Sequence, residues 1–219
     1  AGAMTFDELL GAAASAGAPR AAVEDISIML YTSGTTGRPK GVPRSHRVER
    51  AAAIAHVAHH RCVPGEVMLG VMPFYHTMGV RSLLAAQLVD GCLICQPRFD
   101  SAMTLKLIED ERISSVFLVP TLFHDLMALP QFAAADKSSV RHVGFAGASM
   151  PDGLLARVAK EFKPQLFVNH YGSSEIYTFT IEPRADAKPG SAGKAGINQR
   201  IRVVKLGSSD PDGLAGRGE

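Results

Sequence analysis

From residue 32 to residue 41 the chain reads Thr32-Ser33-Gly34-Thr35-Thr36-Gly37-Arg38-Pro39-Lys40-Gly41. Glycines let a backbone turn its N–H groups toward one point, and the hydroxyls and the Lys40 ammonium add further donors. Such a loop after a strand suits a polyphosphate. It is not the common nucleotide P-loop, because Lys40 is followed by glycine instead of serine or threonine.

Apolar strand patterns alternate with helical patterns on both sides of this loop, from residue 26 to residue 170. The predicted strands are a buried one at 26–31, then 67–72, 92–95, 115–119, 140–145 and 166–169. The predicted helices are 6–14, 46–60 with Ser45 as N-cap, 80–88, 102–111, 121–129 and 151–162. The alternation predicts an α/β fold with a doubly wound, mostly parallel sheet flanked by helices. Residues 201–206 are predicted to begin a further, β-rich segment.

Composition narrows the class of protein. Hydrophobic residues make up 46% of the 219 residues and charged residues 20%, which is typical of a globular protein. The net charge of +2 gives no reason to expect a nucleic-acid partner, and no apolar run is long enough to span a membrane. Three cysteines without a framework spacing, and no signal-peptide pattern, lead us to expect a cytoplasmic protein.

Two later segments point to the same chemistry as the loop. Phe145-Ala146-Gly147-Ala148-Ser149-Met150-Pro151 and Asn169-His170-Tyr171-Gly172-Ser173-Ser174-Glu175 follow in order. Together with the loop, they resemble the three signature motifs of adenylate-forming enzymes, which include acyl- and aryl-CoA ligases. Ser174 stands where the family usually has threonine, a change that keeps the hydroxyl.

The resemblance implies ATP, Mg²⁺ and CoA as cofactors and cosubstrates. It assigns the loop residues Thr32, Ser33, Gly34, Thr35, Thr36, Gly37 and Lys40 to the phosphates of ATP. It assigns the rest of the nucleotide to Gly147, Ala148, Ser149, Asn169, His170, Tyr171, Gly172, Ser173 and Ser174. Glu175 would hold Mg²⁺, and the expected catalytic residues are Glu175, Ser174, His76 and Lys40.

A fourth segment concerns the acid. Pro73-Phe74-Tyr75-His76 resembles a motif of CoA ligases, and the joint pattern is similar to chlorobenzoate–CoA ligases. We therefore expect an aromatic or cyclic carboxylic acid. The expected acid pocket consists of His76, Thr77, Met78, Ala146, Gly172 and Tyr177, with His170 on a further wall.

In the family, the acid carboxylate attacks the α-phosphate of ATP, and CoA then displaces AMP. The resemblance implies that parts of a parent protein on either side of this chain are missing, including the small C-terminal domain with a lysine that drives adenylation. We therefore expect the chain alone to be inactive. The expected division is a tag remnant at 1–4, a helix and linker at 5–25, an incomplete AMP-binding domain at 26–195 and a truncated β-rich start at 196–219. The alternatives are another adenylate-forming enzyme, such as a luciferase-like or peptide-synthetase domain, and a non-catalytic nucleotide-binding fragment.

Three further patterns have weaker functional interpretations. The Cys92-x-x-Cys95 spacing occurs in metal sites, but within an apolar strand a structural role is expected. His56 and His60 have i, i+4 spacing suited to zinc, yet a solvated helix face is expected. Arg44, Arg47 and Arg50 are expected to form a solvated basic face, with a contribution to anion binding as the alternative.

Overall fold

A seven-stranded sheet forms the centre of the computed structural model, which describes residues 5–11, 18, 20–33, 37–205, 207 and 213–216. Its strand order is β4-β3-β5-β6-β7-β8-β9. The strands are β3 (Val67–Gly70), β4 (Cys92–Cys95), β5 (Ser115–Leu118), β6 (His142–Ala146), β7 (Leu166–Tyr171), β8 (Thr180–Glu182) and β9 (Lys194–Ala195). The first five strands in this order, β4, β3, β5, β6 and β7, pair in parallel. Strands β8 and β9 extend the sheet by antiparallel pairing. This confirms the predicted mostly parallel α/β fold.

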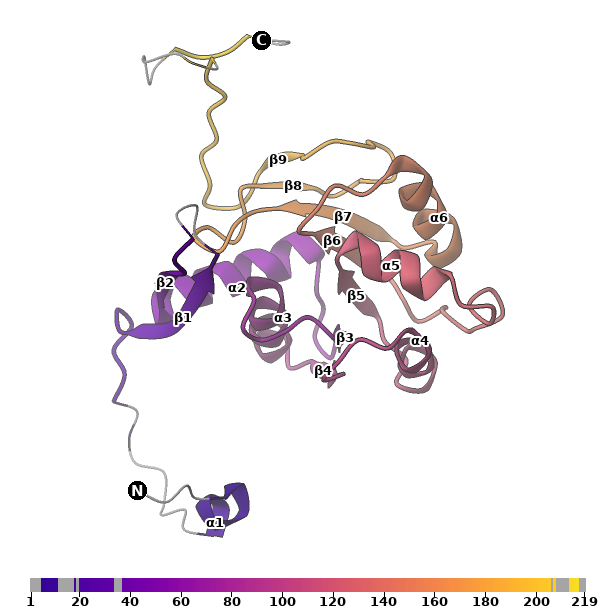
Figure 1. Ribbon diagram of the computed structural model, residues 1–219, viewed down its shortest axis with the longest axis horizontal. Coiled ribbons are helices and arrows are strands. Elements are labelled where there is room, and N and C mark those ends of the chain that lie inside the picture. Colours follow the sequence, from indigo (N-terminus) through magenta and orange to yellow (C-terminus); the bar gives the residue numbers. More distant parts are fainter. Residues whose placement is uncertain are drawn as a thin grey trace.

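Helices cover both faces of this sheet (Figure 1). They are α2 (His46–His60), α3 (Thr77–Leu88), α4 (Ser101–Asp110), α5 (Pro120–Met127) and α6 (Asp152–Phe162). Side chains of successive strand residues point to opposite faces. In β5, Val116 and Leu118 accordingly pack into the main core with α4, α5 and α6, whereas Phe117 packs with Met78 of α3. Helices α2 and α3 pack against each other on this second face.

The segment before the phosphate loop differs from the prediction. Strands β1 (Ile26–Thr32) and β2 (Lys40–Ser45) form a separate antiparallel hairpin, beside α2 in Figure 1. The expected buried strand is wrong, because Ile26 is 62% and Tyr31 69% exposed, and only Leu30 is buried. The sequence pattern was apolar, but a two-stranded hairpin leaves much of its surface uncovered. Lys40 and Gly41, which were expected in a loop, begin β2.

Other boundaries agree with the predictions within a few residues. Helix α2 begins after Ser45, whose Oγ accepts a hydrogen bond from the Val48 N–H, as expected for an N-cap. Helix α3 begins three residues earlier than predicted, with His76 as its N-cap. Helix α1 (Phe6–Gly11) lies apart from the rest, and the remainder of the predicted helix, 12–14, is outside the described residues.

The predicted strand at 201–206 is wrong over its described residues, 201–205. A single bridge between Val204 and Leu214 is present there, and Leu206 is outside the described part. The sequence alternates, but among the described residues the pairing extends no further than this bridge and two flanking hydrogen bonds, from the Lys205 N–H to Gly213 and from the Ala215 N–H to Val203. The expected tag remnant at 1–4 also lies outside the described residues. No helix in the described ranges has both the length and the apolar character needed to cross a bilayer.

Candidate nucleotide and acid site

Three of the singled-out segments follow strands of the same sheet. The His76 segment follows β3, Gly147 follows β6, and the segment Gly172–Glu175 follows β7. Because these strands are parallel, their carboxyl ends lie at one edge of the sheet, where ligands bind in open α/β folds. The topology therefore brings together segments that are far apart in the sequence.

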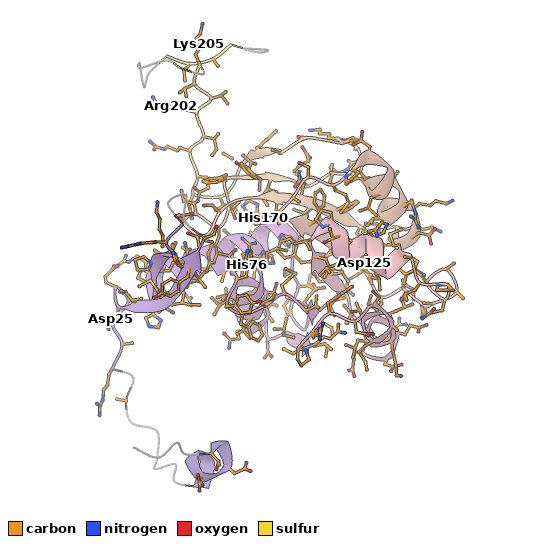
Figure 2. All side chains as sticks on the ribbon, viewed as in Figure 1. Asp25, His76, Asp125, His170, Arg202 and Lys205 are labelled. Atoms are coloured by element: carbon orange, nitrogen blue, oxygen red, sulfur yellow. The ribbon has the colours of Figure 1, made fainter. Side chains whose placement is uncertain are left out.

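A pocket of about 230 Å³ lies at this edge. It is lined by His76, Thr77, Met78, Arg81, Ala146, Gly147, His170, Gly172, Ser173, Ser174 and Tyr177. All six residues proposed for the acid line this one cavity, which we call the acid pocket. His76 and His170 both line the acid pocket, and Figure 2 shows them near the middle of the molecule in that view.

His76 lines the acid pocket, is exposed, and caps helix α3. Its Nδ1 accepts a hydrogen bond from the Met78 N–H at 3.3 Å, so the imidazole presents Nε2 as its free nitrogen. Partial burial, and then the positive charge of Arg81, lower the pKa of His76. The ring is therefore neutral at neutral pH, and it is a hydrogen-bonding group rather than a fixed positive charge.

A second cavity of about 360 Å³ adjoins the acid pocket and shares Gly147, His170 and Gly172 with it. We call it the nucleotide pocket. Its lining is Gly147, Ala148, Ser149, Asn169, His170, Tyr171, Gly172, Gly190 and Ala192. Tyr171 is 56% exposed, which leaves its ring available to a ligand, and Asn169 is held by a hydrogen bond from its Nδ2 to the Ser191 carbonyl oxygen.

The phosphate loop connects β1 to β2, and Gly34, Thr35 and Thr36 are outside the described residues. Thr32 pairs with Lys40 across the hairpin, and neither residue lines the two pockets, nor do Ser33 and Gly37. Gly37 has φ +79°, a conformation that favours glycine.

Glu175 projects from the segment after β7 and is exposed. Hydrogen bonds from its own backbone N–H and from the Ser173 hydroxyl lower the pKa of Glu175, and the Lys40 ammonium lowers it further. The carboxylate is therefore ionised at neutral pH, and Lys40 lies near enough to act on it electrostatically. An ionised, accessible carboxylate is a ligand type that fits Mg²⁺ bound together with phosphate oxygens.

Arg44 belongs to a buried network that the sequence did not reveal. It is 4% exposed and forms an ion pair with Glu49, and its guanidinium carbon lies 3.6 Å from the centre of the Tyr177 ring. The Tyr177 hydroxyl donates to Oε2 of Glu49 at 3.0 Å. The expectation of a solvated basic face is wrong for Arg44, because it lies on β2 and packs inward. Arg47 and Arg50 are exposed as expected.

The solvated face predicted for His56 and His60 is also wrong. Their exposed fractions are 3% and 2%, because the i, i+4 spacing turns both rings toward the sheet, against Phe117 and His170. Burial, followed by the charges of neighbouring groups, lowers the pKa of all three histidines well below the ordinary range, so each is neutral.

His56, His60 and His170 offer nitrogen atoms within 4.8 Å of one another. Tetrahedral zinc would need nitrogens roughly 3.3 Å apart, given zinc–nitrogen bonds of about 2.0–2.1 Å. In addition, Nη1 of Arg81 lies 3.0 Å from Nε2 of His170, and this positive charge opposes a divalent cation. We therefore interpret the three rings as a neutral packing layer behind the acid pocket. Cys92 and Cys95 are free and exposed on the edge strand β4.

Gly190 and Ala192 of the nucleotide pocket were not predicted, and neither was Arg81 of the acid pocket. Arg81 lies in the middle of α3 and is 2% exposed. Its signal was an arginine inside an apolar helix with no acidic residue three or four positions away: those positions hold Thr77, Met78, Leu84 and Ala85.

Taken together, the doubly wound sheet and the two adjoining pockets at its carboxyl edge define a nucleotide-binding α/β domain. The family model for AMP-binding enzymes matches residues 3–219. The chain belongs to this family.

Relatives agree with the resemblance drawn from the motifs. The chain is 38% identical over 193 residues to 4-chlorobenzoate–CoA ligase from Pseudomonas sp. (strain CBS-3), covering 87% of this chain and 36% of that protein. It is 32% identical over 181 residues to indoleacetate–CoA ligase from Aromatoleum aromaticum, covering 81% and 35%. The inhibitor-bound N-terminal domain of FACL13 from Mycobacterium tuberculosis superposes with a TM-score of 0.83 at 28% identity, over 90% of this chain and 50% of that one.

The matched length also shows how much of each relative this chain corresponds to. The chain spans only about a third of the length of the curated relatives. The division into a domain at 26–195 and a β-rich start at 196–219 stays a prediction.

Proposed function

We propose that the protein containing this chain is an ATP-dependent carboxylic acid–CoA ligase. The observation that carries the proposal is the convergence of three separate motif segments on two adjoining pockets that share Gly147, His170 and Gly172. One pocket suits an adenosine group and the other a small acid. The shared wall lets a carboxylate in the acid pocket approach a phosphate bound beside Ser174.

In this proposal, each polar group has a chemical task. The acid carboxylate attacks the α-phosphorus of ATP and pyrophosphate leaves. The CoA sulfur then attacks the acyl carbonyl and AMP leaves. The first step brings two anions together, so the site must supply positive charge and hydrogen-bond donors. Lys40 and the Ser174 hydroxyl supply these, and Glu175 would hold Mg²⁺, which neutralises phosphate oxygens when bound.

We propose an aromatic or cyclic acid as the substrate. The similarity to ligases named for 4-chlorobenzoate and indoleacetate supports this choice. The pocket supports it as well, since Ala146 and Gly172 contribute little side-chain bulk and Tyr177 and His76 offer ring surfaces.

The test is an assay of AMP release by the full-length protein with ATP, Mg²⁺, CoA and a panel of aromatic, alicyclic and long-chain acids. We expect AMP with ring acids, together with the matching CoA ester. AMP with long-chain acids alone would overturn the substrate class and keep the ligase. No AMP with any acid would overturn the proposed function. The 219-residue chain, assayed in parallel, is expected to form no CoA ester.

A further inference from the structure

Arg81 places a buried positive charge in the wall of the acid pocket. The residue is 2% exposed and lies on the second turn of α3, between Val80 and Ser82. Burial lowers the pKa of Arg81 to about 10, so the guanidinium remains protonated at neutral pH. A buried charge is costly unless it is paired, and the protein therefore needs a partner for it.

The described residues offer the Arg81 guanidinium few hydrogen bonds and no negative charge in direct contact. Nη1 donates a hydrogen bond to the Tyr177 carbonyl oxygen at 3.1 Å and lies 3.0 Å from Nε2 of His170. Nε is buried and has no hydrogen-bond partner among the described residues. The Phe117 and Tyr177 rings lie 5.5 and 5.4 Å away, at the outer range of a cation–π contact.

No carboxylate in the described part of the chain forms an ion pair with Arg81. The carboxylate that acts electrostatically on Arg81, after the Tyr177 side chain, is Glu49, and it is already occupied by Arg44 and the Tyr177 hydroxyl. The surrounding His56, His60 and His170 are neutral and supply no negative charge. The contrast with Arg44 is informative: one buried arginine has its own glutamate, and the other faces a cavity.

The position of Arg81 within the pocket indicates which part of a ligand it would meet. In the proposed function the reacting carboxylate lies beside Ser174, in the accessible part of the pocket that also holds the exposed His76. Arg81 is buried deeper, where its guanidinium meets the Tyr177 carbonyl oxygen and the ring of His170, one of the three residues shared with the nucleotide pocket. It therefore faces the end of the acid that does not react.

We propose that Arg81 binds a second carboxylate of the acid, so that the substrates are dicarboxylic acids built on a ring. This inference rests on the proposed ligase function and names its substrate class. A carboxylate at this point would accept hydrogen bonds from the guanidinium, whose Nε lacks a partner among the described residues, and would neutralise a charge that no carboxylate there pairs with. The acid would be held at both ends, with only one carboxylate able to reach the phosphate.

The test uses matched acids and the full-length protein. The acids are benzoate, benzene-1,4-dicarboxylate and the monomethyl ester of the latter, which has the same length and no second charge. We expect kcat/KM for AMP release to be at least tenfold higher with the dicarboxylate than with either monoanion. Arg81→Met should lose on the order of 100-fold on the dicarboxylate and under threefold on benzoate. Arg98→Met, which removes an exposed arginine on a loop, should change the rate with neither the dicarboxylate nor benzoate.

A binding measurement keeps the inference testable apart from catalysis. Millimolar benzene-1,4-dicarboxylate should raise the Tm of the wild-type protein and leave that of Arg81→Met unchanged. Arg81→Met should itself unfold at the same or a higher Tm, because it removes an unpaired buried charge. AMP release with benzoate preferred, or an equal loss on all three acids in Arg81→Met, would overturn the inference and leave the ligase function standing. No AMP with any acid, but an Arg81-dependent Tm shift, would support the subsite and overturn the ligase function. Neither AMP release nor a Tm shift would overturn both.

Discussion

Nη1 of Arg44 donates a hydrogen bond to the carbonyl oxygen of Glu175 at 2.9 Å, joining strand β2 to the segment that follows β7. The same nitrogen lies 3.3 Å from the Ser174 carbonyl oxygen. The side chain thus connects the end of the phosphate hairpin to the two residues proposed to act on the phosphates of ATP. Its ion pair with Glu49 and its contact with the Tyr177 ring hold it in place.

Replacing Arg44 should therefore destabilise the chain strongly. Arg44→Met leaves the buried Glu49 carboxylate without its cation, which typically costs about 3–5 kcal/mol. Urea denaturation would measure the change in the free energy of unfolding. The control is Arg47→Met, which breaks the exposed pair with Glu24 and should cost no more than about 1 kcal/mol. Equal effects of the two substitutions would contradict the buried-network interpretation, and Arg44→Met/Glu49→Gln should recover part of the loss.

The neutral histidine layer makes stability depend on pH. Burial lowers the pKa of His56, His60 and His170 in the folded chain, while unfolded histidine titrates near 6.5. The unfolded state therefore binds more protons below pH 6.5, so stability is fully present above that pH and falls as the pH is lowered. Each such histidine contributes a slope of up to about 1.4 kcal/mol per pH unit.

Urea denaturation at several pH values between 7.5 and 4.5 measures this slope. His60→Phe keeps a ring against Phe117. It should reduce the slope of the free energy of unfolding by up to about 1.4 kcal/mol per pH unit, the contribution of one proton. His46→Gln, at an exposed position on the same helix, should leave it unchanged. A slope that is the same in wild type and His60→Phe would show that His60 is not held neutral.

Gly172 is required by close packing at the junction of the two pockets. A Cβ at this position would lie 1.9 Å from the Tyr177 carbonyl oxygen, a backbone atom that cannot move aside cheaply. We expect Gly172→Ala to destabilise the chain by about 1–3 kcal/mol and to abolish AMP release by the full-length protein. Gly153→Ala in α6 is the matched control, since nothing lies within 4 Å of its added Cβ, and it should be neutral or stabilise by up to about 1 kcal/mol. Thermal unfolding of both variants would decide, and a Gly172→Ala protein as stable as wild type would refute the packing argument.

Glu175 is expected to matter for activity and not for folding, because its carboxylate is exposed. Glu175→Gln in the full-length protein should lower AMP release on the order of 100-fold by weakening the hold on Mg²⁺. The deficit should shrink as the Mg²⁺ concentration rises. Glu111→Gln, at another exposed glutamate, provides the comparison. An unaltered rate at limiting Mg²⁺ would remove Glu175 from the metal role.

Much of the fold could be predicted from local patterns. Helix α2 and its cap at Ser45, and the strand Cys92–Cys95, match the predicted bounds because periodicity and capping depend on residues a few positions apart. Six of the acid-pocket residues could be named in advance because each lies in or beside a recognisable motif, and the order of parallel strands brings those motifs to one edge of the sheet.

The sequence alone therefore determined the family, the alternation of strands and helices, and the motif segments that meet at the two pockets. Only the tertiary structure decided which polar side chains are buried. Some partners of these side chains are far away in the sequence: 130 positions for Arg44, 110 for His60 and 89 for Arg81. A pattern of neighbouring residues therefore cannot predict what surrounds them. Burial of a polar group depends on what packs opposite it. That is why the hairpin β1–β2 could look like a core strand and the histidine pair like a solvated face. For the same reason, the charged wall of the acid pocket became evident only once the chain was folded.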